Sequence, residues 1–368
     1  MRRARIALFL VALTSSACLS GVAVASYCQN TSTGRVPLTD LGAGLYLGQF
    51  EGGLYPNGSN TLPDAQMQAG LAAASAIVPR DVSGNPDPQG GKVILLSIGM
   101  SNTSDEWCQG IGVPNCTAET FGDQAWADSH VNHATLDIVN GAQGGAPADQ
   151  WESPTDTTYN IVRDQRLAPR GETEAQVQVI WLKQADAGPT SSLPSSQADA
   201  YTLESRLGNI LRAIKVRYPN IGQVFLSSRI YAGYASTTLN PEPYAYESGF
   251  SVKWLVQAQI TQMATQGTPP DHVAGDLNYT TVAPWIAWAA YLWADGTIPR
   301  SDGLTWVCSD FQTDGTHPST SGDHKVGAML LAFFLHSPLT QSWFVAVGGT
   351  TTSTTTSSTT TTRPRGCG

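Results

Sequence analysis

A serine, a histidine and an aspartate in this chain have the residue types of a catalytic group. Asp314 precedes His317 by three residues, across a turn that contains Gly315. A carboxylate at that spacing can reach one ring nitrogen of the histidine, fix its tautomer and stabilise the imidazolium. The other ring nitrogen can then take a proton from a hydroxyl, which turns that hydroxyl into a nucleophile. Ser101 is the candidate for this hydroxyl, and the chemistry would be acyl transfer.

Ser101 comes shortly after an apolar run, Val93–Ile98, that has the composition of a buried strand. In open α/β sheets, functional side chains gather at the carboxyl ends of the strands. Gly99, between the run and the serine, allows a close approach of the backbone to a neighbour. Ser101 and Asn102 also suit the N-cap of a helix, for which both residue types are preferred. This stretch by itself leaves both roles open.

A glycine pair, Gly144-Gly145, follows the apolar dipeptide Ile138-Val139 after a few residues. Backbone N–H groups in such a loop can point into a site and stabilise the oxyanion that develops when an acyl carbonyl is attacked. A plain glycine turn is the alternative.

A side-chain amide, Gln184, follows a second apolar run, Val177–Leu182, and could donate another hydrogen bond to the same oxyanion. Its neighbours Lys183 and Asp186 carry opposite charges. They could instead form an ion pair at the surface of the protein.

The elements that must position these residues alternate between strand and helix. Three apolar runs lack the alternation of a half-exposed strand, which is typical of parallel strands covered on both faces. Between the second and the third, leucines and isoleucines recur at helical spacing, which predicts a βαβ unit. A closing helix is expected near the end of the folded part. The pattern predicts a three-layer α/β/α sandwich with a mainly parallel sheet, built from Val93–Ile98, Val177–Leu182, Ala200–Arg217, Val224–Ser228 and Gly322–Leu335.

Taken in order, these pieces resemble the sequence blocks of the SGNH (GDSL-type) hydrolase superfamily, in particular its carbohydrate and sialate O-acetylesterase branches. Three stretches are similar to the first, second and last blocks: Gly99–Asn102, then Gln143–Ala146 with Trp151, then Asp314–Ser319 with Gly322 and Lys325. The third block departs from the family. Most members have Gly-x-Asn there and the acetylesterase branch has Gln-Gly-Glu, whereas this chain has Gln184-Ala185-Asp186.

The resemblance implies a flavodoxin-like fold and a role for each matched residue. Ser101 would be the nucleophile, His317 the base and Asp314 the residue that orients it. The oxyanion would be held by the N–H groups of Ser101 and Gly145 and by the amide of Gln184. Substrate would contact the other two matched side chains, Asn102 and Trp151. No cofactor and no metal are implied.

Both ends of the chain differ from the part between them. Residues 1–25 have a basic start, an apolar centre and a small-residue cleavage site, which predicts a signal peptide and a secreted protein. Lipidation at Cys18 is the alternative. Residues 348–368 are mostly Thr and Ser and predict a disordered tail or linker. We expect an N-terminal extension packed on the catalytic domain over residues 26–91 and the catalytic domain itself over residues 92–347.

Disulfides are plausible in an exported protein, because the environment outside the cytoplasm is oxidising. Five cysteines remain after cleavage of residues 1–25. Cys108 and Cys116 bracket a short loop and are the expected pair. Cys28 and Cys308 could form a second bridge, which would leave Cys367 in the tail.

The charge of the chain argues against some partners. Only 13% of the residues are charged and the formal net charge is −9, whereas nucleic-acid binding needs clustered Lys and Arg. No apolar run after the predicted signal peptide reaches the ~18 residues of a membrane span. His130 and His133 are three residues apart, but no further ligand pattern completes a metal site. We expect a monomer without metal, cofactor, nucleic acid or membrane span.

The substrate is expected to be an acylated glycan or another small ester. The leader, the Thr/Ser-rich tail and the acetylesterase-like blocks favour an acetylated carbohydrate. Aromatic residues are dense in two stretches, 231–246 and 285–293, and such faces can stack on sugars, although the near-helical spacing of the second favours core packing. A short-chain lipid or other ester is an alternative. A non-catalytic glycan-binding protein on the same scaffold is another, which the altered third block favours.

Overall fold

The centre of the protein is a five-stranded parallel sheet. The computed structural model describes residues 25–266 and 270–346. The strands lie in the order β4-β3-β5-β6-β7, all parallel. If the five strands are numbered 1 to 5 by their order in the sequence, their order in the sheet is 2-1-3-4-5. This is the flavodoxin-like order, and it confirms the predicted fold class. The strands are β3 (Val93–Gly99), β4 (Leu136–Asn140), β5 (Val177–Lys183), β6 (Gln223–Leu226) and β7 (Trp285–Trp288).

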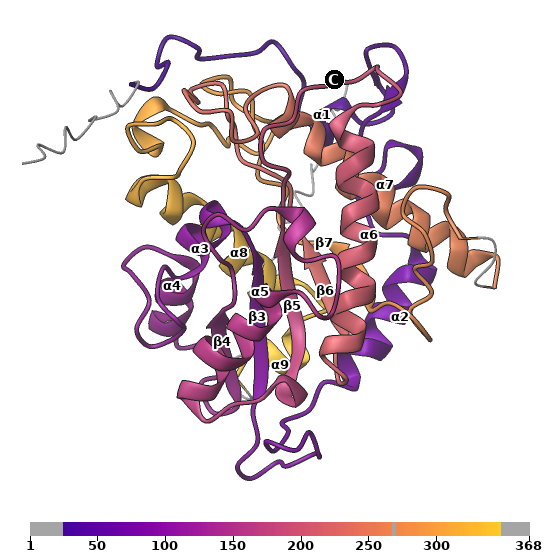
Figure 1. Ribbon diagram of the computed structural model, residues 1–368, viewed down its shortest axis with the longest axis vertical. Helices are drawn as coiled ribbons and strands as arrows, with labels where there is room; N and C mark the ends of the chain where they lie inside the picture. Colours follow the sequence, from indigo (N-terminus) through magenta and orange to yellow (C-terminus); the bar gives the residue numbers. More distant parts are fainter. Residues whose placement is uncertain (1–24, 267–269, 347–368) are drawn as a thin grey trace, which may run out of the picture.

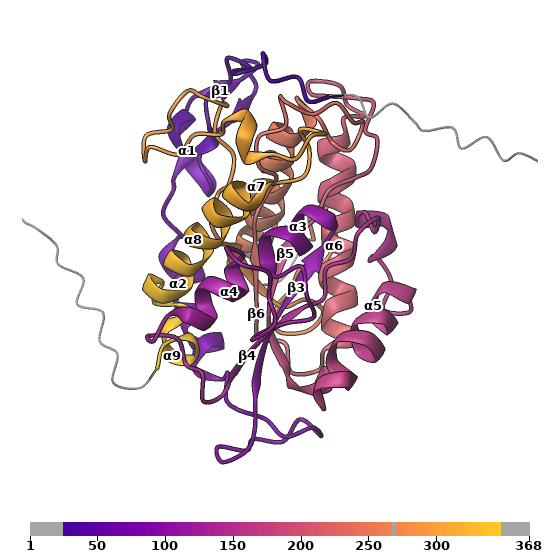
Figure 2. The same cartoon turned by 90° about the vertical axis from the view of Figure 1, so that its left-hand side faces the viewer.

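Helices cover both faces of this sheet. Figure 2 shows α4 (Phe121–Ala127) and α8 (Thr320–His336) on one side and α5 (Thr157–Ile161) and α6 (Asp199–Arg217) on the other. Helix α3 (Ser101–Trp107) begins directly above the end of β3 (Figure 1). Helix α7 (Tyr244–Ala264) packs against α6. A π-helical turn (Val162–Leu167) continues α5, and α9 (Gln341–Phe344) follows α8. Short 3₁₀ turns lie at Ala148–Gln150, Ala168–Arg170, Glu174–Gln176 and Cys308–Asp310.

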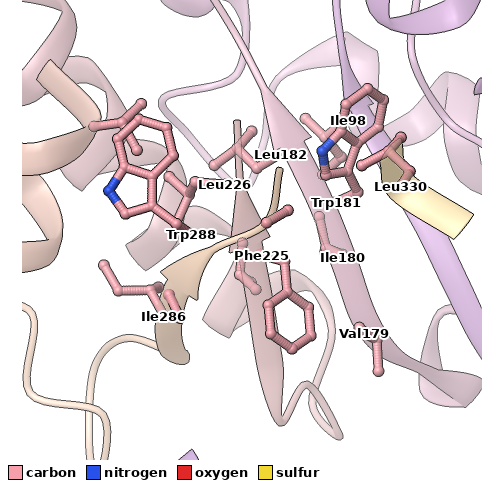
Figure 3. Close-up of a cluster of buried hydrophobic side chains, with 14 of the residues drawn as sticks. Ile98, Val179, Ile180, Trp181, Leu182, Phe225, Leu226, Ile286, Trp288 and Leu330 are labelled. Carbon is pink, nitrogen blue, oxygen red and sulfur yellow. The ribbon is translucent and has the colours of Figure 1, made fainter. Parts of the chain in front are cut away.

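The core lies on both faces of β5 and β6. Every residue of β5 is buried, because the strand has neighbours on both edges and helices on both faces. Figure 3 shows Phe225 and Trp181 within this apolar cluster. Trp181 also stacks on Trp107 of α3, with ring centroids 5.1 Å apart. Burying one such side chain contributes about 1.5–3 kcal/mol, so this contact fixes the end of α3 to the sheet.

The segment before β3 packs on α7 and β7. Tyr46 stacks on Phe250 of α7, and the indole N–H of Trp288 donates to the carbonyl of Leu54. This segment contains α1 (Leu38–Leu41), β1 (Leu45–Tyr46), β2 (Phe50–Glu51), a 3₁₀ turn (Pro56–Gly58) and α2 (Asp64–Ser75). The contacts fit an extension packed on the rest of the chain, while the division into domains at residue 91 stays a prediction.

Some elements differ from the prediction. The stripe from Trp285 to Trp293 does not form a helix, because β7 occupies Trp285–Trp288 and irregular chain follows. Its three tryptophans are all buried, so the expected core packing is confirmed. Three further elements, α2, α7 and β4, are not predicted by the sequence patterns described above.

Two disulfides close loops in the described chain. The predicted pair Cys108–Cys116 is bonded, and so is Cys28–Cys308. The predicted signal peptide with Cys18, and the predicted tail with Cys367, lie outside the described residues. Within the described ranges, no helix is long and apolar enough to cross a membrane.

Candidate active site

The structure brings Ser101, His317 and Asp314 together at the carboxyl edge of the sheet. The hydroxyl oxygen of Ser101 lies 2.8 Å from Nε2 of His317, although 216 residues separate the two in sequence. Nδ1 of the same ring lies 2.6 Å from Oδ2 of Asp314. An ionised Asp314 accepts a hydrogen bond from the N–H at Nδ1, which leaves Nε2 without a proton and able to accept the hydrogen bond of the Ser101 hydroxyl. This is the arrangement that a serine nucleophile requires.

The turn that ends β3 aims Ser101 at the histidine. Ser101 is the first residue of α3, and no side chain caps that helix end. The hydroxyl bonds to His317 instead, so the N-cap alternative does not describe its contact. Gly99 is required here, because a Cβ atom on it would stand 2.2 Å from Oγ1 of Thr103 and 2.3 Å from the carbonyl oxygen of Lys183. The N–H of Ser101, in the first turn of a helix, has no intrahelical acceptor.

The turn that carries His317 depends on Gly315. Its φ is +63°, and a Cβ atom there would stand 2.0 Å from the carbonyl oxygen of Tyr234. The tight turn lets Oδ1 of Asp314 accept hydrogen bonds from the N–H groups of Thr316 and His317, at 2.9 and 3.0 Å.

The same hydrogen bonds control the ionisation of Asp314. Burial raises the pKa of this carboxyl, but the bonds it accepts from the His317 ring and from the backbone outweigh burial and leave its pKa below the usual value. Asp314 is therefore ionised near neutral pH, as the tautomer of His317 described above requires.

Asn102 holds the histidine turn rather than an open face of the site. Its side chain is buried, and its amide donates to the carbonyl oxygen of Thr316 at 2.9 Å. The predicted substrate contact is therefore corrected, since the side chain has almost no exposed surface to offer a ligand.

Replacing Asn102 with alanine is expected to lower kcat about ten-fold or more while KM changes little. The variant leaves the buried carbonyl of Thr316 without its donor, which costs about 1–3 kcal/mol, and it frees the turn that carries His317 from α3. Steady-state kinetics of ester hydrolysis and a melting temperature check both effects. An unchanged kcat in a destabilised variant would mean that the bond serves stability alone.

The glycine pair lies against the nucleophile. The N–H of Gln143 donates to the carbonyl oxygen of Gly99 at 2.9 Å, which ties the loop after β4 to the end of β3. A Cβ atom on Gly144 would lie 3.9 Å from Cβ of Ser101. Among the described residues, none accepts a backbone hydrogen bond from the N–H of Gly144 or Gly145. Both donors are thus available, and Gly144 lies next to Ser101.

The side chains of Trp151 and Gln184 hold this loop through the carbonyl of Ala146. Trp151 is fully buried, and its indole N–H donates to the carbonyl oxygen of Ala146 at 3.2 Å. The predicted contact of Trp151 with substrate is therefore corrected, because the ring is packed edge-on against Tyr159 and has no exposed surface. The amide of Gln184 donates to the same carbonyl at 3.3 Å, so its predicted role as an oxyanion donor stays a prediction.

The charges beside Gln184 do not pair with each other. Nζ of Lys183 lies 2.5 Å from both carboxylate oxygens of Glu106, and both side chains are buried. Asp186 bonds instead to Arg206, at 2.6 Å. The surface pair of Lys183 with Asp186 is therefore wrong. Burial lowers the pKa of Lys183 to about 8, and the charge of Glu106 opposes that fall. The buried pair ties α3 to the end of β5.

The two histidines that were considered as metal ligands both contact Asp128. Nδ1 of His130 lies 2.8 Å from its carboxylate, and Nε2 of His133 lies 2.9 Å from its carbonyl oxygen. In the part of the chain that the structure describes, no group of three or more His, Cys, Asp or Glu side chains could hold a metal ion.

A cavity of about 760 Å³ lies away from the residues around Ser101. It lies between the β1–β2 hairpin and the helices α6 and α7, and Phe50, Tyr201 and Trp254 line it. Glu204 also lines it, with a buried side chain. Burial, and secondly the charge of Asp271, raise the pKa of Glu204 to about 8.

Glu204 is expected to make the stability of the protein depend on pH. The unfolded chain releases this proton near the ordinary pKa, while the folded protein retains it until about pH 8. The stabilisation that it contributes is thus lost as the pH rises from the ordinary to the folded pKa. Glu204→Gln should be more stable than the wild type at pH 8.5 by about 1–3 kcal/mol and show little difference near pH 4. Denaturant midpoints at both pH values check this, and an equal gain at both would contradict it.

No family model and no curated protein match this chain. Several solved structures are similar at low identity. A carbohydrate esterase family 2 enzyme with a carbohydrate-binding domain, from Corynascus thermopiles (Myceliophthora fergusii), is 13% identical, with a TM-score of 0.35 over 67% of this chain and 66% of that one. An extracellular lipase from Streptomyces rimosus is 13% identical, with a TM-score of 0.31 over 66% and 99%. A phospholipase A1 from Streptomyces albidoflavus is 14% identical, with a TM-score of 0.30 over 66% and 100%.

The chain thus spans just under two thirds of the length of the carbohydrate esterase. At these TM-scores the similarities say nothing about the reaction or the substrate of this chain, and the geometry of the site carries the functional proposal.

Proposed function

We propose that this protein is a secreted serine ester hydrolase of the SGNH type that removes acyl groups, chiefly acetyl, from carbohydrate. The single observation that carries the proposal is the unbroken chain of hydrogen bonds from Ser101 through His317 to Asp314, at 2.8 and 2.6 Å. Three side chains from two distant parts of the sequence meet with the distances, the order and the charge that acyl transfer requires.

In the proposed reaction, Oγ of Ser101 attacks the carbonyl carbon of the ester while Nε2 of His317 takes the hydroxyl proton. The tetrahedral intermediate collapses when the bond to the alcohol oxygen breaks, and His317 gives its proton to that oxygen. An acyl-enzyme remains on Ser101. His317 then takes a proton from water, the hydroxide attacks the acyl carbon, and the carboxylic acid leaves as Ser101 regains its proton.

The negative charge of each intermediate forms on the former carbonyl oxygen. The proposed donors are the N–H of Ser101 at the start of α3 and the N–H of Gly145 in the adjacent loop, with Gln184 as a third. The free N–H of Gly144 is a further candidate. Removing one such donor typically costs about 3 kcal/mol of transition-state stabilisation. The hydrogen bond from Gln184 to Ala146 supports an additional role for Gln184, which is to position the loop that carries Gly145.

The exposure of the site supports a large substrate with a small acyl group. Ser101 and His317 are both partly exposed, which fits a site that is open to solvent. An enclosed pocket for a long acyl chain would bury most of that chain. An open site favours a short acyl group that projects from a polymer, which fits an acetylated glycan. Secretion after removal of residues 1–25 is part of the proposal, as is a monomeric state.

The release of acetate from acetylated polysaccharides tests this proposal. The purified protein is incubated with acetylated xylan, with chemically deacetylated xylan as the matched control, and with esters of longer acyl chains. We expect acetate from the first only, and rates that fall with acyl length. Binding to the polysaccharide without any acetate release would instead support the non-catalytic alternative, which the altered third block at Gln184–Asp186 favours. Faster hydrolysis of long-chain esters would support a lipid substrate.

A further inference from the structure

Asp105 is a carboxylate beside the nucleophile that the mechanism above does not use. It lies four residues after Ser101 on α3, and residues at that spacing share one face of a helix, with Cβ atoms about 5–6 Å apart. The side chain is half-buried, and no other described residue forms a hydrogen bond or an ion pair with it. Burial leaves the pKa of this carboxyl above its usual value, although the nearby His317 ring and the Lys183 ammonium oppose that rise.

Several other carboxyl groups lie around Asp105. Asp314 lies close enough to raise its pKa, and Asp105 itself raises the pKa values of Glu106 and Asp323. Two cations lie nearby: Lys183 is balanced by its buried contact with Glu106, and Arg229, which acts on the same carboxylate, is also buried. A negatively charged ligand beside α3 would therefore meet an unpaired, partly exposed carboxylate, while Lys183 and Arg229 are buried and cannot reach the ligand.

We propose that Asp105 makes the site select esters of neutral or cationic alcohols and reject esters of anionic alcohols. The natural substrate is then an acylated neutral glycan rather than a sugar that carries a carboxylate, such as a sialate. This inference rests on the function proposed above and narrows its substrate class.

The position of Asp105 explains why the alcohol part of the ester is selected. His317 gives its proton to the leaving alcohol, so the alcohol oxygen lies beside the imidazole during the reaction. Asp105 acts on the same imidazole from α3, whereas the glycine loop faces Ser101 from the end of β4. A negative group on the alcohol is thus brought toward Asp105. In a partly exposed site such a repulsion corresponds to about a ten-fold loss in kcat/KM.

Three acetyl esters of matched shape test the proposal: 4-acetoxybenzoate is anionic, its methyl ester is neutral, and the 4-acetoxy-N,N,N-trimethylanilinium ion is cationic. The values of kcat/KM are compared between the wild type, Asp105→Asn and Asp105→Glu at the pH of maximal rate. We expect Asp105→Asn to hydrolyse the anionic ester about ten-fold faster than the wild type, to leave the neutral ester within about two-fold, and to slow the cationic ester. Asp105→Glu keeps the charge and should retain the selectivity of the wild type. The preference of the wild type should weaken in high salt.

Equal changes for all three esters, or none, would overturn the proposal, because a structural role of Asp105 does not depend on the charge of the alcohol. Ser101→Ala is measured beside these variants with the same esters. If that variant abolishes turnover while Asp105→Asn leaves the charge preference intact, the selectivity fails and the proposed function stands. If Ser101→Ala keeps full turnover, the proposed function itself fails. Melting temperatures verify that each variant is folded.

Discussion

Ser101→Ala is expected to lower kcat for acetyl ester hydrolysis by about 10⁴-fold or more, with no loss of stability. The variant removes the atom that forms the acyl-enzyme, and the remaining catalysis comes from the oxyanion donors and substrate binding alone. Folding should tolerate the change, because the hydroxyl is partly exposed and bonds to His317, which is itself partly exposed. The hydrolysis of 4-nitrophenyl acetate and the melting temperature, measured on one preparation, check both statements.

Matched variants make this result specific to the site. Ser75→Ala removes an exposed hydroxyl on α2 whose one hydrogen bond among the described residues is to the carbonyl of Ala72, and it should keep the full rate. His317→Ala should lose about as much activity as Ser101→Ala, and the double variant little more than either, because residues that act as one unit do not contribute additively. Undiminished hydrolysis by Ser101→Ala would remove Ser101 from the reaction.

Lys183→Met is expected to destabilise the folded protein by about 3–5 kcal/mol, because it leaves the carboxylate of Glu106 buried without a partner. Both side chains of the pair are buried, and the contact joins α3 to the end of β5. A loss of this size should lower the melting temperature by about 2–4 °C for each kcal/mol. Thermal and denaturant unfolding measure it. The activity that remains should also fall, because α3 carries Ser101.

A double variant distinguishes the loss of the ion pair from the cost of leaving one buried charge without its partner. Lys183→Met with Glu106→Leu removes both charges and should recover much of the stability lost by Lys183→Met alone, since well-packed apolar side chains often replace a buried ion pair at little cost. Lys92→Met serves as the control, because the side chain of Lys92 has no hydrogen bond or ion pair with another described residue. If Lys183→Met is no less stable than Lys92→Met, the buried pair does not hold α3.

The parts of the fold that could be predicted from the sequence are those with a strong local pattern. The strands β3 and β5 are long apolar runs, and α6 has a clear apolar stripe, so their composition and periodicity are sufficient. By contrast, β4 and β7 have only five and four residues. They become strands because their neighbours in the sheet offer free edges, which is a property of the assembled sheet. Helix α7 is buried on most sides, and its buried residues include polar ones such as Glu247, Lys253 and Gln259, so it lacks the apolar stripe that identifies a helix.

The candidate site divides in a similar way. Ser101, Asp314 and His317 could be proposed because nucleophile, base and carboxylate have distinctive types and, for the last two, a distinctive spacing. The buried roles of Asn102 and Trp151 could not, since an amide or an indole has the same sequence signal whether it faces a ligand or a carbonyl of its own chain. The partners of Lys183 and Asp186 follow from tertiary contacts. Asp105 could have been identified from the sequence, because its spacing of four residues from Ser101 places both on one face of a helix.

The bridge between Cys28 and Cys308 has a consequence for the resistance of the protein to proteolysis. The two cysteines are 280 residues apart, so the chain between them, with Ser101, forms a covalent ring, and the segment with Asp314 and His317 is attached just beyond it. A single cut by a protease anywhere in that ring leaves both fragments joined through sulfur. Such a nicked molecule retains its nucleophile and its histidine in one covalent unit, and it separates into two pieces only after reduction.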